Sequence, residues 1–93
     1  MLRHYVFLKY RDGTSDDHVT AFCGHLLALR ATIGGIEHLE IGRDELHVIM
    51  EFATLEALRT YQRHPQHLAV MAFNAPFVAD VGSVDFTSPP TGE

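Results

Sequence analysis

Tyr61-Gln62-Arg63-His64-Pro65-Gln66-His67 is the stretch of this chain that decides its fold. It lies between an amphipathic run, Leu55 to Tyr61, and an apolar run, Leu68 to Phe77. Pro65 has no N–H and disfavours the α conformation in the residue before it, so the stretch predicts a break between two helical segments. The break brings a phenol and two imidazoles to a helix start. These side chains can donate, accept and move protons near neutral pH.

Hydrophobic periodicity on both sides of the break predicts the element order β-α-β-β-α-β. Alternation of apolar and polar residues indicates strands, and apolar residues at helical spacing indicate helices. Ser or Thr residues are placed to cap both helices, and Gly34-Gly35 is expected to end the first in a left-handed conformation. We expect strands over residues 2–10, 36–43, 45–52 and 81–87, and helices over 15–33 and 54–80, the second broken at Pro65. On the first helix the expected apolar stripe is Val19, Phe22, Cys23, Leu26, Leu27 and Ile33.

This order is the split βαβ arrangement, so the predicted fold class is α+β and ferredoxin-like. It predicts a four-stranded antiparallel sheet with both helices on one face. Tyr5, Phe7 and Ile49 should point away from the helices, and an uncovered apolar face indicates an interface. We therefore expect a homodimer, in which two sheets pack face to face about a twofold axis. One domain is expected over residues 1–87, with a flexible C-terminal tail over 88–93.

Composition narrows the function classes. Apolar residues make up 46% and charged residues 20% of the 93 residues, an ordinary globular mixture. The net charge of −5 and the absence of a basic stripe argue against nucleic acid and anionic membranes as partners. Cys23 is the single cysteine, which excludes an intramolecular disulfide and is expected to be a buried structural thiol. No apolar run is long enough to span a bilayer and no signal peptide is visible, so the expected location is cytoplasmic.

Four stretches carry a resemblance to a known family: residues 4–12, 52–58, 61–67 and 81–86. With them the chain resembles the stress-responsive A/B barrel (Dabb) domain family, whose members are dimeric α+β barrels of ferredoxin-like protomers. One departure concerns the turn Gly42-Arg43-Asp44, which is tight where members of the family have a longer polar connection. The short turn predicts a more open or differently bounded ligand site.

The resemblance also implies a chemistry. The family includes polyketide cyclases, of the olivetolic-acid type, that close a poly-β-ketone by aldol condensation without metal or organic cofactor. Their catalytic histidine and tyrosine match His67 and Tyr61 here, as base and as hydrogen-bond donor to the carbonyl oxygen. The helix start at His67 is expected to lower the pKa of its imidazole. The implied ligand is an apolar or aromatic small molecule between sheet and helices, and its expected contacts are His4, Val6, Leu46, Val48 and Met71.

Each candidate residue also has a structural interpretation. His64 and His67 can serve as helix-capping or interface residues, Tyr61 as a core aromatic, and His4 as a structural histidine on a strand. His64 and His67 have the spacing of a metal-ligand pair, but no third ligand is near in the sequence, so we predict no metal. Three other histidines are expected on solvent-facing positions without a function: His18, His25 and His38.

Two functions of different classes therefore remain open on the sequence. The first is a cofactor-independent cyclase or a related aldol, lyase or isomerase enzyme. The second is a non-catalytic dimeric module that binds a small apolar ligand or persists under stress. A more remote alternative is a small monooxygenase or a haem-binding α+β barrel, with His67 or His64 as axial ligand.

Overall fold

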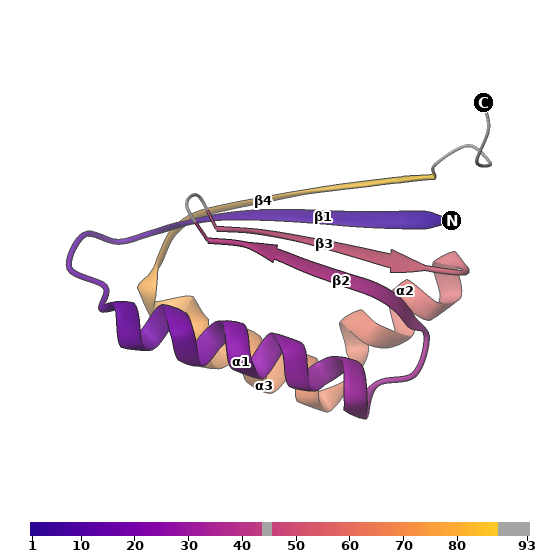
Figure 1. Ribbon diagram of the computed structural model, residues 1–93, viewed down its shortest axis with the longest axis horizontal. Helices are drawn as coiled ribbons and strands as arrows, with labels where there is room; N and C mark the ends of the chain where they lie inside the picture. Colours follow the sequence, from indigo (N-terminus) through magenta and orange to yellow (C-terminus); the bar gives the residue numbers. More distant parts are fainter. Residues whose placement is uncertain (44–45, 88–93) are drawn as a thin grey trace.

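A computed structural model describes residues 1–43 and 46–87 as one sheet with all helices on one of its faces (Figure 1). The expected β-α-β-β-α-β order is confirmed. The expected tail, residues 88–93, and the end of the predicted turn, Asp44, lie outside the described residues. The elements are β1 (Leu2–Tyr10), α1 (Asp16–Thr32), β2 (Ile36–Gly42), β3 (His47–Phe52), α2 (Leu55–Arg63), α3 (Pro65–Asn74), the 3-10 turn η1 (Ala75–Phe77) and β4 (Val78–Thr87).

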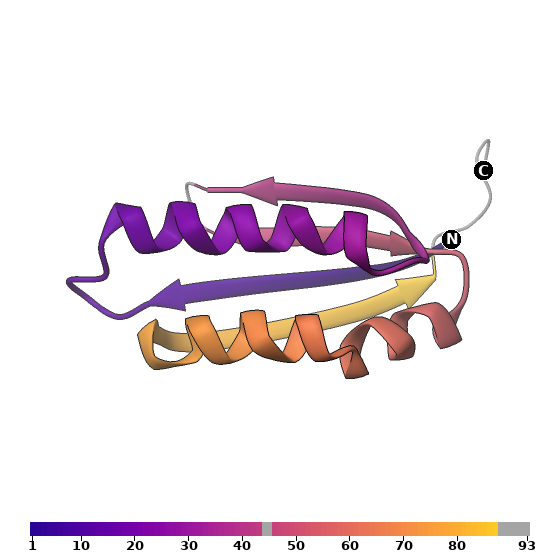
Figure 2. The ribbon, with the colours of Figure 1, turned by 90° about the horizontal axis from the view of Figure 1, so that it is seen from below.

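The sheet has the strand order β2-β3-β1-β4 and is antiparallel throughout. The first and last strands pair along their whole length, from Leu2 opposite Thr87 to Tyr10 opposite Val78. The N-terminus and the end of β4 therefore lie at the same end of the molecule (Figure 1). Seen from the helix side, α1 and α3 run side by side across the sheet (Figure 2). The ferredoxin-like topology predicted from the sequence is confirmed.

Helix α1 begins and ends close to the predicted residues. The Ser15 side chain caps it by accepting a hydrogen bond from the His18 N–H (3.1 Å). The helix ends at Thr32, and the left-handed residue is Gly35 (φ 93°) rather than the Gly34-Gly35 pair. The expectation that Leu27 belongs to the buried stripe is wrong, because its side chain is 57% exposed and Leu29 takes that place in the core. None of the described helices is long and apolar enough to cross a membrane.

The last strand begins earlier than predicted, at Val78 instead of Val81. Helix α3 ends at Asn74, and the 3-10 turn containing Pro76 redirects the chain before residue 80. The Phe77 carbonyl accepts a hydrogen bond from the Arg11 N–H (2.8 Å), which extends the attachment of this segment to β1. Apolar alternation missed the first three residues of β4, because they lie at a sheet edge and are not buried in a regular pattern.

The core lies between the helices and the inner face of the sheet. Its most buried side chains are large and apolar: Phe22, Phe52, Met50 and Leu58. Tyr61 belongs to the same cluster and is only 2% exposed. Cys23 is buried there too, as expected for a structural thiol. Because apolar burial is the main stabilising contribution to folding, this inner layer fixes which face of each strand points to the helices.

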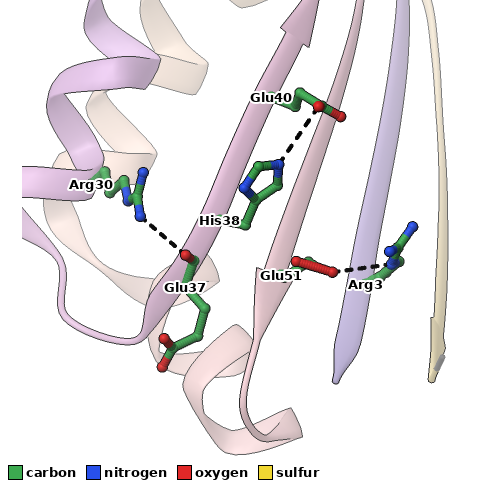
Figure 3. A network of polar contacts seen from close by, with 6 residues as sticks. All are labelled: Arg3, Arg30, Glu37, His38, Glu40 and Glu51. Atoms are coloured by element: carbon green, nitrogen blue, oxygen red, sulfur yellow. Dashed lines mark hydrogen bonds and ion pairs between the residues drawn. The ribbon is translucent and has the colours of Figure 1, made fainter. Parts of the chain in front are cut away.

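The outer face of the sheet, turned away from the helices, is apolar on β1 and β4 and polar toward β2. Phe7, Val84 and Phe86 are 45–53% exposed on it. His47 lies on this face and stacks there on Tyr5, with ring centroids 5.9 Å apart. Toward β2, the outer face carries two polar pairs (Figure 3). Arg3 Nε lies 3.2 Å from Glu51, and His38 Nε2 lies 3.7 Å from Glu40. Arg30 joins the end of α1 to β2 by donating to the Glu37 carbonyl (3.0 Å).

One expectation about the histidines is wrong. His18 was placed on a solvent-facing position, yet it is half-buried and lies over Phe73 and Phe77, with ring centroids 4.7 and 3.9 Å away. The His18 Nε2 and the Tyr10 hydroxyl both bind the Asn74 Oδ1, at 2.9 and 2.8 Å. Helix periodicity missed this contact because α3 and η1, more than fifty residues away, supply the ring partners.

Candidate functional site

The predicted helix break is present at His64. This residue has extended backbone angles (φ −64°, ψ 134°) and separates α2 from α3, with Pro65 in the first turn of α3. His64 Nδ1 accepts a hydrogen bond from the Gln66 N–H (3.1 Å) and so caps the new helix. The lone pair of Nδ1 is thus used by the cap. His64 therefore has a structural role at the break.

The break brings Tyr61 and His67 together, with ring centroids 4.4 Å apart. Tyr61 ends a buried stripe of α2, and its burial raises the pKa of the phenol, so the hydroxyl keeps its proton. His67 Nδ1 lies 3.1 Å from the Gln62 carbonyl oxygen, to which it must donate a proton. The neutral ring then carries its lone pair on Nε2. A base and a hydrogen-bond donor are thus adjacent.

Burial lowers the pKa of His67 below its ordinary value, and nearby His4 lowers it further, while the hydrogen bond to the Gln62 carbonyl acts in the opposite direction. The expected direction is therefore confirmed. The expected cause, the positive end of α3, is replaced by desolvation as the largest contribution. At neutral pH the imidazole is uncharged and able to accept a proton.

His4 completes the cluster from the sheet. It lies on the inner face of β1, is 7% exposed, and its ring centroid is 6.4 Å from that of Tyr61. Its Nδ1 is hydrogen-bonded to Asp85 on β4, directly opposite in the strand register. A carboxylate on Nδ1 fixes the tautomer and the orientation of an imidazole and leaves Nε2 for another partner.

Sequence reasoning missed Asp85 as a site residue. Its position in the strand register carries the signal, because β1 and β4 pair antiparallel from Leu2 and Thr87 inward. That register makes Asp85 the cross-strand partner of His4. Recognising Asp85 therefore requires the pairing of β1 with β4, which the apolar pattern of a single strand does not contain.

The other predicted ligand contacts are divided between two places. Val6 and Val48 are opposite each other in the sheet and pack in the core next to His4, and Met71 follows one helical turn after His67. Leu46 is separate, because its carbonyl accepts a hydrogen bond from the Leu8 N–H (2.9 Å) near the far end of β1. The structure therefore brings His4, Tyr61 and His67 together and leaves Leu46 apart.

Two hollows on the described part of the protomer stand out, and Tyr61, His67 and His4 are not among the residues that line them. The larger, about 690 Å³, lies at the far end of the sheet and includes Leu46. The smaller, about 470 Å³, lies between α1 and β2 beside Cys23. The Tyr61–His67 pair faces the packed inner layer instead. Within residues 1–43 and 46–87, no three His, Cys, Asp or Glu side chains are grouped so that they would hold a metal ion.

Comparison with known proteins identifies relatives of this fold. A family model described as the stress responsive A/B barrel domain matches residues 2–88. A dimeric ferredoxin-like protein of unknown function from Thermobifida fusca superposes with a TM-score of 0.85 at 27% identity, over 94% of this chain and 90% of its own. A search of curated proteins found no match.

Two more distant structures share the fold alone. A Dabb family protein with a ferredoxin-like fold from Mesorhizobium loti has a TM-score of 0.78 at 23% identity, covering 96% of this chain and 97% of its own. A hydroxynitrile lyase from Passiflora edulis has a TM-score of 0.84 at 13% identity, covering 99% and 96%.

Proposed function

The chain belongs to the stress-responsive A/B barrel domain family, and from that premise we propose that it is a homodimeric, cofactor-independent enzyme acting on a small carbonyl compound. The reaction is an aldol-type cyclisation of a polyketone or a related lyase or isomerase step. One observation carries the proposal: Tyr61, His67 and the His4–Asp85 pair converge at the helix break from four different elements.

The proposed step begins with proton removal. His67 Nε2 takes the acidic proton from a carbon between two carbonyl groups, and the electron pair moves to the carbonyl oxygen as an enolate. The Tyr61 hydroxyl donates a hydrogen bond to that oxygen while its negative charge grows. The enolate carbon then attacks a further carbonyl carbon along the same chain, and a carbon–carbon bond forms as the π bond of that carbonyl breaks. The new alkoxide takes the proton back from the His67 imidazolium, so charge and atoms balance.

His4 has a binding role in this scheme. Asp85 holds its Nδ1, so Nε2 is directed to the side of the ring away from Asp85. From there its lone pair can accept a hydrogen bond from an enol or hydroxyl group of the substrate and hold the two reacting carbons at a set distance. Positioning of this kind contributes to rate by holding the reacting atoms in the orientation for attack.

The homodimer is proposed on the outer face of the sheet. Phe7, Val84 and Phe86 expose large apolar side chains there. A contiguous apolar patch of this kind is typical of a protein–protein interface. The same face is flanked by charged residues toward β2, which matches an apolar centre with a polar rim. The Thermobifida fusca relative is described as dimeric, which supports the same assembly here.

A turnover assay on a linear tetra-β-ketone, in which a carbon between two carbonyls can close a six-membered ring on the fourth carbonyl, tests the proposal. We expect His67→Gln to reduce turnover by about 10²–10⁴-fold, the range of a general base, and Tyr61→Phe by about 10²–10³-fold. His25→Gln is the matched control, because His25 is exposed on α1 and lies outside the cluster. If both cluster variants keep the turnover of the control, or if the wild type turns over no carbonyl compound while still binding one, the protein is a non-catalytic ligand-binding dimer.

A further inference from the structure

The larger hollow lies at the end of the sheet where β1 extends past the start of β3. β3 begins at His47, opposite Phe7, and the Leu8 N–H donates a hydrogen bond to the Leu46 carbonyl just before it. Among the residues that the structure describes, the next two positions of β1, Lys9 and Tyr10, pair with β4. The resulting notch has a volume of about 690 Å³, within the range of about 300–1,000 Å³ of small-molecule sites.

Flat aromatic rings form the outer-face wall of this hollow. The Phe7 ring lies against the backbone of Gly82, and the His47 ring lies against that of Gly42, so closely that a Cβ at either glycine would collide with the ring. Tyr5 lies between them, 14° from parallel with His47. The two glycines therefore leave room for the rings close to the sheet. Phe7 is tilted by 53° to Tyr5, so the three rings form an angled aromatic wall that a planar molecule can contact by its face on one ring and its edge on another.

The rest of the lining mixes apolar and charged side chains. Lys9 and Arg43 bring cationic groups to the hollow, in a chain whose net charge is −5. Two carboxylates also line it: Asp80 lies opposite Lys9 in the strand register, so these two charges offset each other, and Asp16 lies in the first turn of α1, where the helix dipole favours it. Arg43 is the remaining cationic group of the lining. The Arg43 guanidinium matches a carboxylate or phosphate and also stacks on aromatic rings.

A buried network holds the inner wall in place. The Tyr10 hydroxyl donates a hydrogen bond to the Asn74 Oδ1, which is also in hydrogen-bond contact with His18. The Asn74 residue is 3% exposed. Burial raises the pKa of Tyr10 to about 12, so this donor stays protonated at physiological pH. The ring of Tyr10 is therefore a rigid part of the lining rather than a mobile side chain.

We propose that this hollow is a second binding site, distinct from the Tyr61–His67 cluster, for a planar aromatic ligand that carries one anionic group. The ring of the ligand lies against Tyr5 and Phe7, and its carboxylate or phosphate faces Lys9 and Arg43. The site goes beyond the proposed reaction, and all the lining residues named here belong to one protomer. In the proposed homodimer the second sheet covers its outer-face side, and the ligand enters from the notch beside α1.

A pair of fluorescent probes tests both parts of this proposal. The anionic probe 8-anilinonaphthalene-1-sulfonate has a planar aromatic body and a sulfonate, and N-phenyl-1-naphthylamine is its uncharged analogue. We expect one sulfonate probe to bind per protomer, more tightly than the neutral probe. Lys9→Gln/Arg43→Gln should weaken the anionic probe at least tenfold and leave the neutral one unchanged. The control Arg59→Gln/Arg63→Gln removes the same charge from exposed positions of α2 and should change neither.

Two further variants locate the probe. Gly82→Ala places a Cβ under the Phe7 ring and lifts it, so both probes should bind more weakly while circular dichroism stays unchanged. His67→Gln should leave probe binding intact whether or not it abolishes turnover, which separates this site from the proposed reaction. Three results would overturn the proposal. They are an equal loss of anionic-probe affinity in the two double variants, a stoichiometry of several probes per protomer, and a loss of probe binding in the His67→Gln variant.

Discussion

Tyr61 is the residue at which packing and chemistry can be separated by experiment. Its ring is 2% exposed and lies 5.4 Å from Phe52 and 4.4 Å from His67, so it belongs to the core as well as to the proposed site. Among the described residues, its hydroxyl takes part in no hydrogen bond that holds it in place. Removing the hydroxyl and removing the ring should therefore have very different effects on stability.

The expected magnitudes follow from burial. Truncating a fully buried aromatic ring to alanine costs about 3–5 kcal/mol. A 93-residue domain has a total free energy of unfolding of about 5–14 kcal/mol, at roughly 0.05–0.15 kcal/mol per residue. Tyr61→Ala should thus remove from a fifth of that stability to nearly all of it. Tyr61→Phe keeps the ring and should change stability by about 1 kcal/mol or less, the net contribution of one ordinary hydrogen bond.

Urea unfolding at one fixed protein concentration measures both variants, since dimerisation makes the midpoint concentration-dependent. With an m-value of about 1–3 kcal/mol/M, Tyr61→Ala should lower the midpoint by roughly 1–5 M. Tyr61→Phe should stay within about 1 M of the wild type and still lose turnover. A loss of more than about 2 kcal/mol in Tyr61→Phe would refute this reasoning, because the hydroxyl would then be a structural hydrogen-bonding group.

Three further predictions concern other parts of the molecule. Burial lowers the pKa of His67 in the folded state, so its contribution to stability is complete above about pH 6.5 and is lost as the pH falls through the lowered value. His67→Gln should accordingly flatten the acid side of a stability–pH profile measured by urea unfolding, and an unchanged profile would contradict the burial argument. Val84→Glu should convert the dimer to protomers in sedimentation velocity, whereas Leu27→Glu, equally exposed but on α1, should leave the mass unchanged; a dimer in both variants places the interface elsewhere. Asn74→Ala deprives the Tyr10 hydroxyl of its acceptor and should cost about 1–3 kcal/mol in thermal unfolding, and a loss below about 0.5 kcal/mol would mean that water replaces the amide.

The fold was largely predictable because its signals are local. Alternation in β1 and the Ser15 and Thr54 caps report on stretches of a few residues. The errors occur where a distant segment decides the outcome. Leu27 has the same character as Leu26 but points away from the sheet. His18 looked solvent-facing until η1 placed Phe77 against it.

The candidate site was predictable only in part. Tyr61 and His67 are six residues apart, so the steric effect of Pro65 alone is enough to bring them near each other. Asp85 was missed, and it lies 81 positions from the His4 that it binds. Leu46 was assigned to the same pocket because it shares a strand face with Val48, yet it lies at the other end of β1.

By itself the sequence determined the helix break at His64-Pro65, the order of the elements and the face that each strand turns to the core. These follow from backbone sterics and from the period of apolar residues, which act over a few neighbours. Only the tertiary structure decided that Asp85 orients His4, that Gly42 and Gly82 lie under aromatic rings, and that a hollow lies at the end of the sheet. Those features depend on strand register. Register is set when the whole inner face is buried at once, so no short stretch of the chain contains it.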